Sequence, residues 1–357
     1  MSVDRLSASV QTLYVELLEL EQIAAAVAAT GVAGSGSFVS KRIKGNTYWY
    51  LQRSEGAKTR QLYLGPDSPA LNAWMDESRA ARANRRGGEV TRRSLCAMLQ
   101  AGGATSESAA VLKVLQTLAE AGVYRLGGVI VGTLAFRAIA NVLGVQFRGA
   151  ALRTEDVDVA HDPRIGVALA SEVTRGDLPR RLGKMEPPFL PVPGLDPRHP
   201  SATFIVRRRQ LRVDFLTPAR GKSEGPVALH DFGCAAQPLP FLEYLLEGTI
   251  EAVVIGSSSV LVNLPQPARF AFHKLFTAAS RGVAMQTKVA KDLAQAAALI
   301  EVLLDDRPGD LDLAWSAVAS RKVRATMIAA TRAIEPSLRR RLGDLIGDFA
   351  PTPNVGS

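Results

Sequence analysis

Positions 155–160 have the sequence EDVDVA, in which acidic and apolar residues alternate. This alternation is typical of a β-strand with one buried face, and it places Asp156 and Asp158 on the same side of that strand. Positions 211–216, LRVDFL, repeat the pattern around Asp214. If the second strand lies near the first, three carboxylates meet at one place. They would repel one another unless a hard cation such as Mg²⁺ neutralised them, so the pattern indicates metal-assisted phosphoryl chemistry.

An apolar run and a glycine turn precede the acidic strand. Positions 126–131, LGGVIV, indicate a strand that leads into Gly132-Thr133, and residues 134–143 have helical periodicity. A helix that begins with free backbone N–H groups and a small hydroxyl residue is an anion site. For Asp156 and Asp158 alone, the alternative is that they are two surface charges on the solvent-exposed face of a strand. The upstream turn and the third aspartate favour a phosphate and metal site instead.

The bulk composition limits the class of protein. The chain has 357 residues, of which 47% are hydrophobic, enough for two or three domains with a sizeable core. No apolar run approaches the ~20 residues of a membrane span, and the first residues lack the pattern of a signal peptide. Cys96 and Cys234 are too few for a disulfide framework. We expect a soluble, cytoplasmic protein whose net charge of +9 favours polyanionic partners.

An amphipathic helix is expected over 5–28. Its apolar stripe must pack on the rest of the chain or on a second copy, so an oligomer through this helix is one expectation.

The pattern along the chain predicts five segments. The expected segments are an N-terminal helix (1–34), a basic β-hairpin and helix (35–104), an α/β segment with the aspartates (105–264), a helical domain (265–350) and a disordered tail (351–357). The helix of the second segment is expected over 68–87, with Gly87-Gly88 as its stop.

The hairpin is both aromatic and basic. Its two runs, 38–51 and 58–64, include Tyr48-Trp49-Tyr50 and the cations Lys41, Arg42, Lys44, Lys58 and Arg60. Such a surface over 38–64 can stack bases and follow phosphates, so RNA or another nucleic acid is a candidate partner. The alternative is a hairpin whose aromatic residues form a small core of their own. The proline-rich stretch 176–200 is expected to be a long loop of undetermined role, and the four histidines lack metal spacing.

The strand, the glycine turn, the helix and the three aspartates together resemble the nucleotidyltransferase superfamily of DNA polymerase beta. Positions 131–136, VGTLAF, with 153–160, RTEDVDVA, look closest to a bacterial nucleotidyltransferase-like branch. The resemblance covers about residues 123–280. Its motifs are moderately specific together and weak separately. Thr133 departs from the commoner Gly or Ser, and its methyl group crowds the turn.

The resemblance implies a role for each motif residue. Gly132 and Thr133 would hold the β- and γ-phosphates of an NTP. Asp156 and Asp158 would ligate two Mg²⁺ ions about 3.5–4 Å apart. Asp214 would complete the metal nearest the acceptor and help deprotonate the attacking hydroxyl.

Three cations of the helical region are further candidates for binding the nucleotide. Lys274 lies where relatives often place a triphosphate-binding lysine, and Arg281 follows two helical turns later. Lys288 and Asp292, at i and i+4, resemble the lysine–acid pairs of the toxin branch. The alternative for each is a solvated helix charge or a local ion pair.

The sequence therefore predicts an α+β protein. Its nucleotidyltransferase core is a mixed β-sheet with helices packed on it, flanked by the N-terminal helix, the basic hairpin and a C-terminal helical bundle. The expected activity is Mg²⁺-dependent transfer of an NMP from an NTP to a hydroxyl acceptor, with release of pyrophosphate. RNA, such as a tRNA end, is the preferred acceptor, a protein or small molecule remains open, and a toxin-like role rests on analogy alone. The alternative function is an inactive nucleic-acid-binding or partner-binding protein of the same fold.

Overall fold

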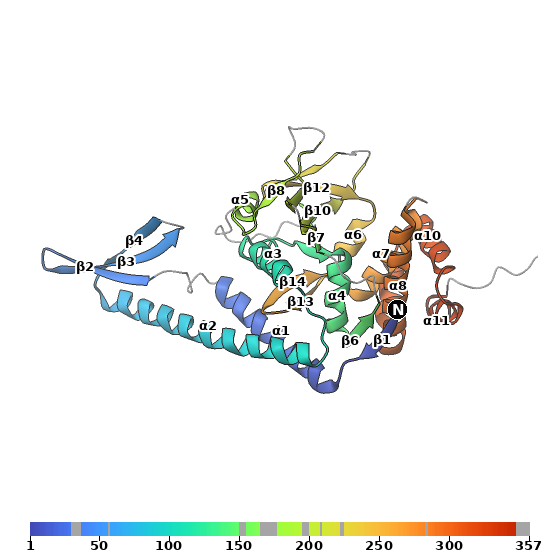
Figure 1. Cartoon of the computed structure of the whole chain (residues 1–357), viewed down its shortest axis with the longest axis horizontal. Coiled ribbons are helices and arrows are strands. Elements are labelled where there is room, and N and C mark those ends of the chain that lie inside the picture. The colour runs from blue at the N-terminus through green and yellow to red at the C-terminus, as the bar shows by residue number, and fades with distance from the viewer. Residues whose placement is uncertain are drawn as a thin grey trace, which may run out of the picture.

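The computed structural model describes residues 1–29, 37–55, 58–149, 155–164, 177–194, 200–207, 209–221, 225–282 and 285–347. Figure 1 shows a body built around a mixed sheet, and an arm in which one long helix carries a small sheet away from that body. The helices of the C-terminal region lie at the other end of the body, opposite the arm. The predicted tail, 351–357, falls outside the described residues.

The central sheet of the described chain mixes parallel and antiparallel pairs, as expected for the α+β class. Its main path is β11–β12–β10–β7–β5, with β9 beside the first half of β10 and β8 beside β9. The strands are β5 (Val129–Val131), β7 (Asp156–Ala160), β8 (Phe189–Pro191), β9 (Thr203–Val206), β10 (Arg212–Pro218), β11 (Val227–Leu229) and β12 (Cys234–Leu239). Strand β10 is parallel to β7, whereas β5 is antiparallel to β7. The two aspartate-bearing strands are therefore confirmed, and they are direct neighbours.

Helices and a second hairpin cover this sheet and share one core with it. Large apolar side chains from α4, β10 and α7, such as Phe136, Phe215 and Phe272, are fully buried in the same cluster. These elements are α3 (Ala109–Glu120), α4 (Gly132–Val142), α5 (Leu178–Gly183), α6 (Leu242–Leu246), β13 (Ile250–Ile255) and β14 (Ser259–Leu264). The proline-rich stretch, expected as a loop, contains α5 and β8 in its described part.

The C-terminal region is helical, as predicted. Amphipathic periodicity placed these helices to within a few residues of α7 (Pro267–Ser280), α8 (Gln286–Asp306), α9 (Pro308–Ser316), α10 (Arg321–Thr331) and α11 (Pro336–Ile346). Their apolar stripes continue the body's core through Leu299, Leu303 and Trp315. In the described part of the chain, no helix is both long and apolar enough to cross a membrane.

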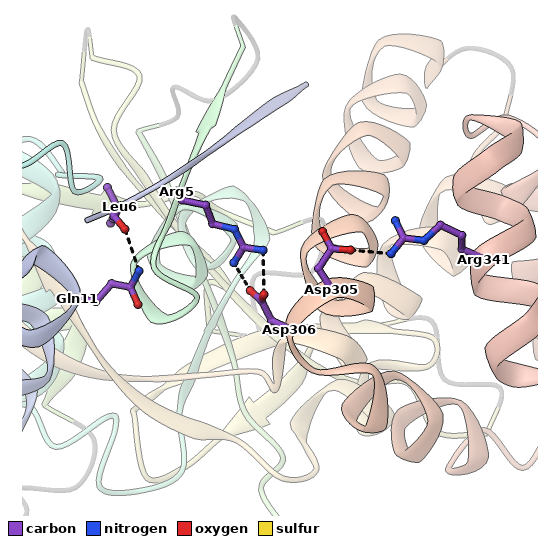
Figure 2. A network of polar contacts seen from close by, with 6 residues as sticks. All are labelled: Arg5, Leu6, Gln11, Asp305, Asp306 and Arg341. Carbon is purple, nitrogen blue, oxygen red and sulfur yellow. Dashed lines mark hydrogen bonds and ion pairs between the residues drawn. The ribbon is translucent and has the colours of Figure 1, made fainter. Parts of the chain in front are cut away.

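The N-terminus is tied to both halves of the body. Strand β1 (Ser2–Arg5) pairs with β6 (Val145–Arg148), a strand that the sequence did not indicate. At the end of β1, Arg5 forms an ion pair with Asp306 of α8, and the adjacent Asp305 accepts a hydrogen bond from Arg341 of α11 at 2.6 Å (Figure 2). These charges are partly exposed, so each pair contributes only ~0–1 kcal/mol to stability. Their main effect is on position, because the Arg5–Asp306 pair holds the end of α8 against β1.

Helix α1 (Ala8–Ala29) finds its apolar partner within the chain. Its stripe, which includes Val10, Tyr14 and Leu17, packs with the end of α2 and with β13 and β14. The Tyr14 hydroxyl donates to the backbone carbonyl of Val253 (3.3 Å) and accepts from the backbone N–H of the same residue (3.1 Å). The stripe therefore does not require a second copy, and an oligomer through this helix stays a prediction.

The arm comprises residues 37–101 in their described part, and it differs from the predicted hairpin and helix in two ways. The first predicted run divides into two strands, so the sheet has β2 (Ser37–Ile43), β3 (Asn46–Glu55) and β4 (Lys58–Pro66). Helix α2 (Pro69–Ala101) does not stop at Gly87-Gly88 but continues to Ala101, so the whole helix has 33 residues. Neither glycine adopts the positive φ of a helix C-terminal stop. The prediction of a helix that ends there is wrong.

Candidate active site

The three predicted carboxylates come from two adjacent parallel strands. Asp158 of β7 lies opposite Asp214 of β10, and Asp156 lies opposite Arg212. Alternation along each strand places all four side chains on one face of the sheet, while Val157 between the two aspartates points into the core. The sequence alone left the pairing of these strands open. The register brings the carboxylates together.

Gly132 closes this face of the sheet beside Asp158. It follows β5 directly and has a φ of +69°, a left-handed conformation that favours glycine. A Cβ built on Gly132 would overlap the Asp158 carboxylate oxygen and lie 3.1 Å from its Cγ. Thr133, in the first turn of α4, is buried. The residue that precedes α4, Val131, forms no side-chain cap to the first N–H groups of this helix.

The three carboxylates also influence one another electrostatically. Burial is the largest cause that raises the pKa of Asp158, and the charges of Asp214 and Asp156 add to it, so that this pKa rises from an ordinary 3.8 to about 6. Lys274 and Arg212 act in the opposite direction. A cation at this position would relieve the repulsion. The donor set of three carboxylates fits Mg²⁺, which prefers hard oxygen ligands.

The described residues do not contain a preassembled group of three metal ligands. Arg212 explains this arrangement, since its Nε lies 2.5 Å from Oδ2 of Asp214. The other oxygen of Asp214 accepts a hydrogen bond from the Thr203 hydroxyl at 2.6 Å. Asp214 is therefore held on β10 by two neighbours. Both of its carboxylate oxygens are thus engaged by neighbouring side chains in this structure.

Two of the predicted cations meet at one buried acid. Lys274 of α7 is buried and lies 2.7 Å from Asp292 of α8, whose second oxygen lies 2.9 Å from Arg281. Asp292 thus holds two cations in fixed positions. The charge of the Lys274 ammonium also lowers the pKa of Asp158, so the ion pairs of Asp292 belong to the same electrostatic environment as the carboxylates.

Lys288 is exposed, and its role in binding the nucleotide stays a prediction, whereas Lys291 is a further candidate that the sequence analysis did not name. In the structure, the ion pairs of Asp292 are with Lys274 and Arg281, and Lys288 is exposed. One turn further along α8, Lys291 is partly buried. Burial lowers its pKa, as does Lys274, whereas Asp292, Asp156 and Asp158 raise it. Lys291 therefore shares the field of the carboxylates. No sequence signal separates it from Lys288, because both lie in the same polar turn.

The nearby histidine His273 cannot serve as a base with an ordinary pKa. It is buried against the ring of Phe241, with the two ring centroids 6.1 Å apart. Burial and the neighbouring charges of Lys274 and Arg281 lower its pKa to about 3. It is therefore neutral at physiological pH.

Comparisons with known proteins can now be set beside this geometry. A family model described as Nucleotidyltransferase matches residues 109–320. A second model, described as a domain of unknown function (DUF6788), matches residues 13–73, which include most of α1 and the sheet of the arm. No curated protein and no solved structure matches the chain. The first match covers more than half of the chain and includes the carboxylates, the glycine turn and the cations of α7 and α8. The chain therefore belongs to this nucleotidyltransferase family.

Proposed function

We propose that the protein transfers a nucleoside monophosphate from an NTP to a hydroxyl group, with release of pyrophosphate, in a Mg²⁺-dependent reaction. The observation that carries this proposal is the set of three mutually repelling carboxylates on β7 and β10, faced by the cations of α7 and α8. In this proposal, metal ions would bind between the acids and phosphates would bind beside the cations.

Each group of residues in the site would have its own role. Asp156 and Asp158 would hold two metal ions, and Asp214 would hold the one nearer the acceptor. Bound Mg²⁺ would supply Lewis-acid stabilisation of the phosphate oxygens and lower the pKa of the attacking hydroxyl. The backbone N–H groups after Gly132 would bind the terminal phosphates, together with Lys274, Arg281 and Lys291.

The bond changes balance without a further reactant. The acceptor oxygen forms a bond to the α-phosphorus, while the bond from that phosphorus to the bridging oxygen of the β-phosphate breaks. The proton of the hydroxyl passes to Asp214, which gives it to solvent. The electron pair leaves with pyrophosphate, whose charge the cations neutralise.

We propose RNA as the acceptor, with a toxin-like role as one biological setting by analogy. Protein and small-molecule acceptors are tested in the same experiment. The purified protein is incubated with Mg²⁺ and each α-labelled NTP in turn, together with total RNA, protein extract or a metabolite mixture. Label should enter one acceptor class, disappear with EDTA and return with excess Mg²⁺. Absence of transfer to every class, with RNA binding unchanged in Asp156→Ala, would instead support the alternative of an inactive binding protein.

The two neighbouring lysines of α8 provide a matched prediction. We expect Lys291→Ala to raise the KM for NTP about tenfold, because removal of one charge-assisted phosphate contact costs ~1.5–3 kcal/mol. Lys288→Ala should change the KM by less than about twofold, because the side chain is exposed and its contribution is screened. Steady-state kinetics of both variants measures the difference. Equal effects would contradict the placement of Lys291 beside the phosphates.

A further inference from the structure

The sheet of the arm has two different faces. One face is closed by α2: Leu51 of β3 and Met75 of α2 are buried, and the ring of Phe38 meets Trp74 at a centroid distance of 5.6 Å. Trp49 belongs to this closed face, and its Nε1 donates to Asp67 at 2.9 Å. The closed face thus forms a small core together with α2.

The other face carries aromatic and polar side chains and is not used by this core. We call it the open face. Tyr63 is 53% exposed and lies beside Tyr50 and Tyr48, at ring centroid distances of 5.4 and 6.2 Å. Lys41 lies 4.8 Å from the centroid of the Tyr50 ring and donates to Gln61 at 2.6 Å. The open face consists of Lys41, Tyr48, Tyr50, Gln52, Gln61 and Tyr63.

Charge determines which partner suits this face. Residues 37–66 contain six basic residues and one acidic residue, so the segment is strongly cationic for its size. Exposed tyrosine rings bind the flat faces of nucleobases, and a cation beside them, as Lys41 lies beside Tyr50, binds phosphates. A duplex hides its base faces within the stack, whereas a single strand presents them. Single-stranded nucleic acid therefore complements both the rings and the charge.

The arm holds this face at a fixed distance from the body. Helix α2 is about 50 Å long at 1.5 Å per residue. It is fixed at its C-terminal end, where Leu95 and Leu99 pack against α1, and where Arg92 lies 3.1 Å from Glu21. Figure 1 shows the sheet at the opposite end of the helix, clear of the body. A partner bound there must be long to reach the carboxylates as well.

We propose that the open face binds a single-stranded RNA at a distance from the end that enters the active site. The binding itself is independent of the reaction, while the role as an acceptor rests on the proposed function. The inference narrows the acceptor to a polynucleotide long enough to span the arm, and it excludes a mononucleotide or a short oligonucleotide as the preferred acceptor.

Binding is measured with the full chain and a fluorescent single-stranded RNA of mixed sequence, about 30 nucleotides long, by anisotropy at two salt concentrations. We expect Tyr63→Ala and Tyr50→Ala each to raise the Kd about tenfold, because each removes one stacking surface. Tyr63→Phe, which keeps the ring, should stay close to wild type. Lys322→Ala removes an exposed cation of α10, outside the arm. It controls for a substitution elsewhere on the surface and should bind RNA as tightly as wild type.

The integrity of the arm is followed by tryptophan fluorescence, since Trp49 lies on the closed face and Trp74 of α2 packs against it. The third tryptophan, Trp315, is buried in α9 of the body and should contribute equally in all variants. The proposal is overturned if folded Tyr63→Ala and Tyr50→Ala bind RNA as tightly as wild type. It is also overturned if a duplex of equal length, or a poly-glutamate peptide, binds as tightly as the single strand.

A second readout separates this inference from the proposed function. Transfer is compared on acceptors of about 30 and about 6 nucleotides, the shorter being too short to span the arm. The wild type should prefer the long acceptor, and Tyr63→Ala should lose that preference while its rate on the short acceptor is unchanged. If no acceptor is modified, the proposed function fails, and the binding data alone decide whether the open face binds single-stranded RNA. If both acceptors are modified equally by the wild type, the arm has no role in choosing the acceptor.

Discussion

Asp158→Asn is expected to reduce nucleotide transfer by about 10³-fold, equivalent to ~4 kcal/mol of transition-state stabilisation. The variant removes a carboxylate that would hold both metal ions. Its neighbours Asp156 and Asp214 remain, so metal binding should weaken rather than vanish. Transfer of label at saturating NTP and graded Mg²⁺ measures both effects. A variant that retains a tenth of wild-type activity would show that the centre of the site lies elsewhere.

The same substitution should stabilise the metal-free protein, with a defined pH dependence. The folded-state pKa of Asp158 is raised to about 6 from 3.8, so its favourable contribution is complete below pH 3.8 and is lost as the pH rises through about 6. The ionised carboxylate then costs about 2 kcal/mol, after allowance for the partial exposure of the side chain. Asp158→Asn removes that cost. Its melting temperature should exceed that of wild type by a few degrees at pH 8, and much less at pH 4.5.

Glu155→Gln is the matched control for Asp158→Asn. Glu155 is exposed and lies next to Asp156, but strand alternation turns it to the opposite side from the aspartates. It should leave transfer and the pH dependence of melting unchanged. A lower melting temperature for Asp158→Asn at pH 8 would contradict the repulsion inferred among the three carboxylates.

Gly132→Ala is expected to reduce transfer by about 10²-fold and to destabilise the fold by ~2–3 kcal/mol. The left-handed conformation alone costs a non-glycine residue ~1–2 kcal/mol. The added methyl group must also displace the Asp158 carboxylate, because the space of a Cβ is already occupied by it. Both the phosphate-binding turn and a metal ligand therefore move. Urea unfolding and kcat/KM for NTP measure the two effects.

Gly248→Ala separates strain from crowding. Gly248 has nearly the same φ, +65°, but a Cβ there meets nothing within 4 Å. Its replacement should cost ~1–2 kcal/mol of stability and leave transfer close to wild type. If both variants lose the same stability and activity, the contact between Gly132 and Asp158 does not explain the need for glycine.

The parts of the structure that sequence predicted well are those with a local pattern. Alternation placed β7 and β10, and helical periodicity placed α7 to α11, because burial of one face leaves a trace along the chain. Strand β1 leaves no such trace. Its four residues pair with β6, at least 140 residues away, and the pairing depends on an edge that the folded body provides.

Tertiary contacts overrode local rules at two further places. Gly87 and Gly88 lower helix propensity by ~1 kcal/mol each, yet α2 continues through them because its two ends pack against the sheet and against α1. In the site, spacing paired Lys288 with Asp292. Asp292 instead turns towards α7, where Lys274 and Arg281 neutralise it in a buried position. An acid buried between helices takes the partners that the packing supplies, and these cannot be read from one helix.

Because α2 is one continuous helix, its length also determines the direction in which the sheet of the arm faces. Each residue of an α-helix adds about 1.5 Å and turns the helix by about 100°. Because α2 is anchored at one end and carries the sheet at the other, inserting one residue midway would rotate the tyrosines by that angle around the helix axis. Seven inserted residues, about two turns, would lengthen the arm by about 10 Å and restore the original direction. A change in the length of this helix that is not close to a whole number of turns would therefore point the sheet in another direction.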